Sequence, residues 1–237
     1  MNLTLLLATW RQRLMSPIRV VLLGALFGVP LLGVAFVHGA GLSILGDSMG
    51  LVLVFAVGMI GQDVSSGVLQ LLFARPVGRP EYVWSRWLAT GVGASGVGVL
   101  QVALAVALLS ARGVAPPAQE AALFAGQRVL DCFGLAAVFT LLSSLVGGVG
   151  DLALFYLGVI AGGVINMGGG AFQQPLLARA GDELTGFMLA KVDLAQVVSA
   201  SPLPLFSIAS YLSTVALCLA LAMVVMNRKE LSYASGG

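Results

Sequence analysis

The sequence predicts an all-α integral membrane protein with six transmembrane helices, and two observations support this prediction. First, the chain has 237 residues, of which 59% are hydrophobic and only 9% are charged. A soluble domain has roughly a quarter of its residues charged. Second, six apolar stretches each approach the ~20 residues that a helix needs to cross the hydrocarbon core of a bilayer. Most of the surface is therefore expected to face lipid, and residues 1–237 are expected to form a single transmembrane domain.

The expected spans are separated by short polar segments. In chain order they are Ile18–Val37, Ser43–Gly61, Leu88–Ser110, Val129–Gly147, Leu152–Gly170 and Phe206–Met226. Only GGVGD (Gly147–Asp151) separates the fourth span from the fifth. An uninterrupted run from 129 to 170 would be about twice the length that one crossing needs. We therefore interpret GGVGD as a tight hairpin turn at the membrane surface.

The basic residues favour an orientation with both termini in the cytoplasm. With six spans, eight of the twelve Lys and Arg residues fall on the side of the termini, and cytoplasmic segments are typically enriched in Lys and Arg. These eight are Arg11, Arg13, Arg19, Arg75, Arg79, Arg86, Arg228 and Lys229, and the other four are Arg112, Arg128, Arg179 and Lys191. The expected location is the plasma membrane, which in a bacterium is the inner membrane.

An amphipathic N-terminal helix is expected over Leu3–Met15. Its apolar residues at helical spacing are Leu3, Leu6, Leu7, Trp10 and Leu14, with Gln12 and Arg13 turned away. A Trp-bearing helix flanked by arginines tends to lie in the headgroup plane. The segment is therefore predicted to be an interfacial helix, and a frayed leader is the alternative.

A further outer helix is expected between the fifth and sixth spans, in the polar stretch Ala171–Leu205. Asp182 and Glu183 favour a helix start, because acidic residues stabilise the N-terminal end of a helix. Apolar residues then recur on one side of this helix, namely Leu184, Phe187, Met188, Val192, Ala195 and Val198. We expect a re-entrant or interfacial helix. Leu184, Phe187 and Met188 could form part of an exit gate, or the helix could be a lid that packs on the bundle.

Small residues within the spans indicate packing rather than chemistry. Gly24 with Gly28, and Gly158 with Gly162, have the four-residue spacing that lets helix backbones approach each other. We interpret both pairs as packing contacts within the chain. Cys132 and Cys218 lie in apolar runs far apart in the sequence, and we expect them to be packing residues rather than a disulfide or metal pair.

The sequence does not indicate an enzyme, and it predicts no catalytic, cofactor-binding or metal-binding residue. No GxxxxGK[ST] motif occurs, so the chain lacks the loop that cradles nucleotide phosphates. His38 is the only histidine, which excludes a site made of several histidines. Ion-coupled carriers typically hold the ion at a midplane acid or a broken helix. The nearest candidates for such a site are Asn166, Gln101 and the glycines 168–170, and Asp131 is expected at interfacial depth.

The most unusual segment is DVSSGVLQLLFARPVGRPEYVWSRW, from Asp63 to Trp87, because it concentrates charge between two apolar runs. Asp63, Ser65 and Ser66 are good residues to start a helix. One apolar stripe then consists of Val64, Val68, Leu71 and Leu72, and a second ridge consists of Leu69 and Phe73. Pro76 ends the helix, because a proline disfavours helical geometry in the residue before it. A short cytoplasmic helix with two apolar faces can bury one face against its own bundle, and the other needs a partner.

The run DVSSGVLQLLFARPVGRPEY resembles the cytoplasmic signature of ABC-2 type transporter permeases, located between the second and third spans. The matching residues are Asp63, Gly67, Leu69, Leu71, Leu72, Pro76 and Arg79. The ending NRKELSYA (Asn227–Ala234) is similar to the basic tail that follows the last span of that family. The six-span layout and the N-terminal helix also fit, so the resemblance covers nearly the whole chain. In one departure, the turn GGVGD lacks basic residues.

The resemblance implies the permease half of an ATP-driven transporter, most simply an exporter. Two permease subunits, identical or different, would form the pathway, and separate ATP-binding subunits with their own ATP and Mg would dock beneath them. The cytoplasmic helix would be the coupling helix. Its contact residues are expected to be Asp63, Gly67, Val68, Leu69, Leu71, Leu72, Phe73, Arg75, Pro76 and Arg79. The alternatives are an ion-coupled secondary transporter and a non-transporting membrane assembly protein.

Overall fold

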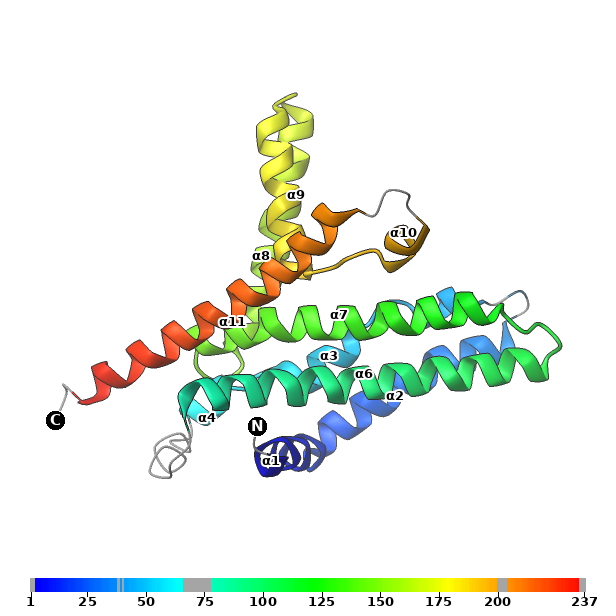
Figure 1. Ribbon diagram of the computed structural model, residues 1–237, viewed down its shortest axis with the longest axis horizontal. Helices are drawn as coiled ribbons and strands as arrows, with labels where there is room; N and C mark the ends of the chain where they lie inside the picture. Colours follow the sequence, from blue (N-terminus) through cyan, green and yellow to red (C-terminus); the bar gives the residue numbers. More distant parts are fainter. Residues whose placement is uncertain (1–2, 38, 40, 66–77, 200–203, 235–237) are drawn as a thin grey trace.

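The computed structural model describes residues 3–37, 39, 41–65, 78–199 and 204–234, and all the regular elements found there are helices (Figure 1). In chain order these are α1 (Leu3–Leu14), α2 (Pro17–Phe36), the 3-10 helix η1 (Leu42–Leu45), α3 (Met49–Ala56), α4 (Gly61–Ser65), α6 (Arg79–Ala111), α7 (Ala118–Leu145), α8 (Gly150–Ala171), α9 (Pro175–Leu189), α10 (Leu194–Ser199) and α11 (Leu205–Ala234).

Six stretches of the described residues are long and apolar enough to cross a membrane. They are Pro17–Phe36, Leu42–Val64, Arg79–Ala111, Ala118–Leu145, Gly150–Ala171 and Leu205–Arg228. Each overlaps one of the six predicted spans. The chain is therefore an all-α, multi-pass membrane protein, as its composition and hydropathy predicted.

Two of these helices begin earlier than the hydropathy pattern suggested. α6 begins at Arg79 rather than at Leu88, and α7 begins at Ala118 rather than at Val129. Prolines at these points suit the start of a helix, because the first helical residues need no N–H partner. The charged residues that seemed to lie outside the spans, Arg86 and Arg128, are in fact buried inside the molecule.

α7 is the central helix of the bundle, in contact with α3, α6, α8 and α11. Small residues such as Ala136 and Ala137 let these neighbours approach closely. Phe139 on α7 lies 4.8 Å from Phe155 on α8, measured between ring centroids, and both rings are fully buried. Cys132 and Cys218 are also buried and unbridged, which confirms that they are packing residues. The hydrophobic core therefore surrounds α7.

The second predicted span, Ser43–Gly61, is not one continuous helix. It consists of η1, α3 and α4, and a turn over residues 57–60 separates α3 from α4. Gly58 in this turn has a φ of +68°, a conformation that glycine adopts far more readily than other residues. The turn therefore exposes backbone groups that an intact helix would satisfy itself.

α8 and α9 form a helical hairpin that stands away from the bundle of α6 and α7 (Figure 1). A side chain at Gly162 would collide with Thr185 and lie 3.0 Å from the carbonyl oxygen of Gly181, and one at Gly158 would collide with Met188. The prediction of packing within the chain is thus confirmed for Gly158 and Gly162. It is wrong for the second pair, Gly24 and Gly28, which have open space beside them.

The outer helix predicted to start at Asp182 differs in the structure. α9 begins at Pro175, and Ala190, with a φ of +43°, ends it before α10 begins at Leu194. Asp182 lies in the middle of α9, where Asn166 of α8 donates a hydrogen bond to it. The prediction failed because Pro175, a residue suited to the first turn of a helix, already begins α9 before Asp182 and Glu183.

Proline makes a gap in the hydrogen bonding of α2. Pro30 has no N–H group and cannot donate to the carbonyl of Leu26 one turn earlier. Gln101 of α6 fills this gap, since its Nε2 lies 3.0 Å from the carbonyl oxygens of Leu26 and Phe27. Gln101 is 1% exposed. This side chain therefore attaches α2 to α6 where an unpaired carbonyl would be costly.

We predict that Gln101→Leu destabilises the protein by about 1–2 kcal/mol, because it leaves the Leu26 carbonyl without a donor. For a chain of this size such a loss lowers the apparent Tm by several degrees, which a thermal unfolding scan of the purified protein in detergent would measure. Gln12→Leu is the matched control, because Gln12 is exposed on α1. Equal Tm values for the two variants would contradict the role of Gln101.

Candidate functional site

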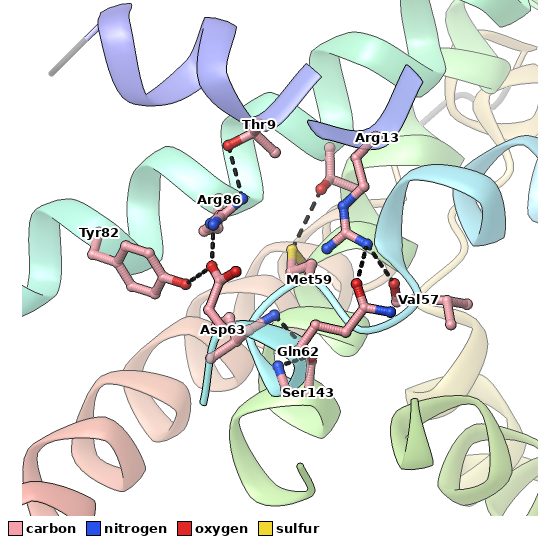
Figure 2. A network of polar contacts seen from close by, with 12 residues as sticks. Thr9, Arg13, Val57, Met59, Gln62, Asp63, Tyr82, Arg86 and Ser143 are labelled. Carbon is pink, nitrogen blue, oxygen red and sulfur yellow. Dashed lines mark hydrogen bonds and ion pairs between the residues drawn. The ribbon is translucent and has the colours of Figure 1, made fainter. Parts of the chain in front are cut away.

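A network of polar side chains lies at the end of the bundle formed by α1, α4 and the start of α6, which we call the α1 end (Figure 2). The opposite end, with η1, the end of α6 and the start of α7, is the η1 end. The members of this polar network are Thr9, Arg13, Arg19, Gln62, Asp63, Tyr82, Arg86, Ser143 and Asp151. They come from six helices, so the network joins most of the bundle at this end.

The centre of the network is the carboxylate of Asp63. Arg86 of α6 forms an ion pair with its Oδ2, and the Tyr82 hydroxyl donates a hydrogen bond to the same oxygen at 2.6 Å. Arg86 also donates to the Thr9 hydroxyl of α1 at 3.0 Å. All four residues are buried. This contact joins α4, α6 and α1 through one guanidinium group.

A second part of the network satisfies the backbone groups freed by the turn between α3 and α4. The carbonyl oxygen of Val57 accepts from Arg13 at 2.8 Å and from Arg19 at 3.2 Å. The Ser143 hydroxyl of α7 accepts from the N–H groups of Ile60 at 3.0 Å and Gly61 at 2.9 Å. Buried backbone groups need such partners, because leaving them unpaired costs a hydrogen bond each. The side chains around the turn therefore make its geometry possible.

The turn between α7 and α8 completes the network from a third side. Asp151 is fully buried and accepts a hydrogen bond from the N–H of Gly58 at 2.7 Å. The N–H of Gly148 donates to the carbonyl of Gly61 at 2.8 Å, and a side chain at Gly61 would collide with this turn. The predicted turn is present over residues 146–149. Asp151, however, is enclosed by the chain instead of lying at an exposed surface.

The side of α1 that contacts the bundle includes Arg13, which the sequence pattern placed away from the apolar side of this helix. Arg13 is only 2% exposed, whereas Leu7 and Leu14 are 58% and 48% exposed. Trp10 adds a hydrogen bond from its indole N–H to the carbonyl of Ala89 at 2.7 Å. The arginine faces inward because the Val57 carbonyl needs a donor there. Sequence periodicity grouped Leu6, Leu7 and Leu14 on one apolar side, and of these three only Leu6 is buried.

Arg13 is buried and lies close to two other positively charged side chains, both of which disfavour its charged form. Burial, together with the nearby positive charges of Arg19 and Arg86, lowers the pKa of Arg13 to about 10. The side chain therefore remains protonated at neutral pH and keeps its full capacity to donate. Three guanidinium groups, those of Arg13, Arg19 and Arg86, here face the two carboxylates of Asp63 and Asp151, so the described part of the network is net positive.

Of the ten residues predicted to couple to a partner, the structure describes two. Asp63 is at the centre of the network, and Arg79 is the first residue of α6 and half-buried. The other eight, Gly67, Val68, Leu69, Leu71, Leu72, Phe73, Arg75 and Pro76, lie outside the described residues. Asp63 and Arg86 flank this segment in the sequence. Their ion pair therefore joins described parts of the chain on either side of it.

The residues predicted as a possible outer gate lie on α9. Phe187 and Met188 are half-buried and pack against the main hydrophobic core, and Met188 contacts Gly158 of α8. Leu184 is half-buried one turn earlier. Their position at the base of the hairpin is compatible with either alternative, a gate or a lid.

The chemistry of the polar network is structural and mechanical. Among the described residues, no group of three or more His, Cys, Asp and Glu side chains could hold a metal ion. The Asp63 carboxylate is occupied by Arg86 and Tyr82, so it is not presented to a substrate. What the arrangement can do is transmit a displacement of the chain next to Asp63 to α6 and α1.

Of the nine members of the network, the sequence predicted only Asp63 as a site residue, and it missed Thr9, Arg13, Arg19, Gln62, Tyr82, Arg86, Ser143 and Asp151. One signal was available, because Gly58 and Gly61 interrupt an apolar run just before Gln62 and Asp63. Such glycines are compatible with a broken helix, whose freed backbone groups would require nearby polar side chains. Which side chains supply them depends on contacts between residues as far as 93 positions apart.

Breaking the central ion pair should be more damaging than removing both of its members. We predict that Arg86→Met lowers the free energy of unfolding by about 3 kcal/mol, because it leaves the Asp63 charge buried without this guanidinium. The double variant Asp63→Asn with Arg86→Met should recover part of that loss. Thermal unfolding of the three proteins in detergent would measure both effects. Equal stability of the single and double variants would contradict this account.

Arg13 and Arg11 offer a matched test of the inward-facing arginine. We predict that Arg13→Leu destabilises the protein by about 1.5–3 kcal/mol, because hydrogen bonds from a charged donor to Val57 and Gln62 are lost. Arg11→Leu should change stability by no more than about 0.5 kcal/mol, since Arg11 is exposed. Thermal unfolding would measure both variants, with limited proteolysis reporting release of α1. Similar results for both would show that Arg13 has no special role.

No protein-family model, no curated protein and no solved structure matches this chain. The functional proposal that follows therefore depends on the residues of the chain itself, namely the segment that begins at Asp63 and the polar network around it.

Proposed function

We propose that this chain is the permease subunit of an ATP-driven transporter of the ABC-2 type, acting as an exporter. The segment from Asp63 to Arg79 would dock on a separate ATP-binding subunit at the cytoplasmic face. The observation that carries the proposal is the buried contact of Asp63 with Arg86 and Tyr82. A segment that receives force from a partner must be joined firmly to the bundle at both ends, and this contact supplies such a joint.

The network supports a mechanism in which helices move as rigid bodies. A displacement of the segment after Asp63 would pass to α6 through Arg86 and to α1 through Thr9. It would also reach α7, because α4 is attached to Ser143. ATP-driven closure of the partner subunits would then tilt these helices between inward- and outward-facing states, a change of the hinge or shear type.

A second permease subunit would complete the pathway. The exposed side of α8 carries a continuous apolar stripe of Leu157, Ile160, Val164 and Met167, each at least 59% exposed. The spacing of these four residues puts them on one face of the helix. This stripe supports a contact with lipid or with the second subunit, which is either a copy of this chain or a relative of it.

The broken second span is the one feature that favours the alternative of an ion-coupled carrier, because such carriers bind ions at unwound helices. Here the Val57 carbonyl, which an ion would need, already accepts from two arginines. The net positive charge of the surrounding network would also repel a cation. We therefore favour the ATP-driven transporter.

The test uses Leu69 and Phe73, which the sequence predicts to form the second apolar ridge of the segment. The double variant Leu69→Ser with Phe73→Ser should lose the ATP-binding subunit, and with it Mg-ATP hydrolysis, when the tagged chain is purified from its native membranes in mild detergent. The protein should remain inserted and stable. Mass spectrometry of the purified complex, with the hydrolysis rate, measures the outcome.

Leu32→Ser with Phe36→Ser is the matched control, because Leu32 and Phe36 have the same types and spacing but are exposed on α2. This control should keep the ATP-binding subunit and its hydrolysis. Absence of any Walker-type ATPase from the wild-type complex would refute the proposed function. Retention of the ATPase by the Leu69 and Phe73 variant would refute this docking surface.

A further inference from the structure

At the η1 end, a cavity of about 870 Å³ that is open to the molecular surface lies between the first half of α7 and the chain that connects α9 to α10. Its apolar walls include Leu123 and Phe124 of α7 and Val192 of the connection. Small-molecule sites have volumes of roughly 300–1,000 Å³ and mostly apolar walls with a few polar groups. The cavity therefore has the size and lining of a site for a small organic molecule.

Asp131 is the most buried polar residue that lines this cavity, and it is 6% exposed. Its Oδ1 accepts a hydrogen bond from Nε2 of Gln127 at 2.8 Å. Within the described part of the chain, no hydrogen bond reaches its Oδ2. A buried carboxylate is costly unless it is paired. Lys191 and Arg128 act on this one only as nearby charges without an ion-pair contact, and its hydrogen-bond partner is one neutral amide. This carboxylate is therefore able to accept a hydrogen bond from a bound molecule.

Gln127 holds both walls of the cavity in place. Its Nε2 also donates to the carbonyl of Val192 at 2.7 Å, and its Oε1 accepts from the N–H of Leu194 at 2.8 Å. One side chain thus attaches the α9–α10 connection to α7 and orients Asp131. The site is formed before any ligand enters it, which lowers the entropic cost of binding.

The charges around the cavity are predominantly negative. Glu120 and Asp193 line it together with Asp131, whereas Lys191 is the one cationic residue among the lining residues. The Lys191 ammonium is itself engaged, since its Nζ lies 3.5 Å from Oδ2 of Asp47. The nearby Arg128 does not line the cavity. Its guanidinium donates to the backbone carbonyls of residues 45 and 46, and its Cζ lies 5.3 Å from the ring centroid of Phe124. The cavity consequently favours a positively charged ligand.

We propose that this cavity binds an amphiphilic organic cation, with a protonated amine paired to Asp131 and an apolar body against Leu123, Phe124 and Val192. A bare metal ion does not fit, because among the described residues no three potential ligands of the acid, Cys or His type lie close enough to hold one. If the chain is a permease as proposed above, amphiphilic amines are also the class of molecule that it transports. That last step rests on the proposed function, whereas the binding site does not.

The test measures binding of three molecules that share a naphthalene body and differ in charge: 1-naphthylmethylammonium, neutral 1-naphthalenemethanol and anionic 1-naphthylacetate. Equilibrium dialysis of the purified full chain in detergent should give tightest binding for the ammonium. Asp131→Asn should weaken ammonium binding about tenfold or more, since a charge-assisted hydrogen bond is lost. The affinity for the neutral alcohol should change less than about twofold, because the alcohol makes no charge-assisted hydrogen bond that this variant could remove.

Two further variants keep the test decisive. Glu183→Gln removes an exposed carboxylate that lies outside this cavity and pairs with Arg179, and it should leave ammonium binding unchanged. Ala195→Trp should fill the cavity and reduce binding of the ammonium and the alcohol together. Equal affinity of the wild type for all three molecules, or unchanged ammonium binding in Asp131→Asn and Ala195→Trp, would overturn the proposal. The dialysis test needs no ATP-binding subunit. If it fails, the proposed transporter function still stands. If the chain proves to bind no ATP-binding subunit, the measured ligand binding still stands.

Discussion

The rest of the structure depends on one constraint, which is that a backbone polar group away from water must find a hydrogen-bond partner inside the protein. A continuous helix pairs its own backbone groups, but the second span is interrupted between α3 and α4. Val57, Gly58, Ile60 and Gly61 there depend on side chains from α1, α2, α7 and α8 for their partners. The break therefore brings four other helices to one place. The polar network at the α1 end is the consequence.

The same constraint acts at the η1 end of the bundle. Gln101 supplies the donor that Pro30 cannot provide to Leu26, and Arg128 supplies donors to the carbonyls of residues 45 and 46 at the end of η1. These polar side chains lie within helices that are otherwise apolar, and each is buried. Each of these side chains donates to two backbone carbonyls of a neighbouring segment, so polar residues help to fix how the apolar helices are arranged.

The two candidate sites share α7, which packs along α6. α6 has 33 residues and α7 has 28. Arg86 of α6 and Ser143 of α7 belong to the polar network, whereas Asp131 and Gln127 of α7 belong to the cavity at the η1 end. Long helices tilt as rigid bodies, so a movement at one end changes the other without any local rearrangement between them. This arrangement gives a proposed docking segment and a proposed ligand cavity a direct structural connection.

The amino-acid sequence by itself determined the class of the protein and the approximate positions of its spans, because burial in lipid requires a long run of apolar residues whatever their neighbours are. It also indicated the turn before α8 and the packing roles of Gly158 and Gly162. It assigned Arg86, Arg128 and Arg13 to exposed positions, since hydropathy treats every charge as a surface residue. Only the tertiary structure decided that these arginines face inward, because each responds to a carbonyl or carboxylate brought to it by a distant part of the chain. Only the tertiary structure likewise showed that α9 packs along α8 at Gly162 and Gly181, because such a contact between helices leaves no local signal at Asp182 and Glu183.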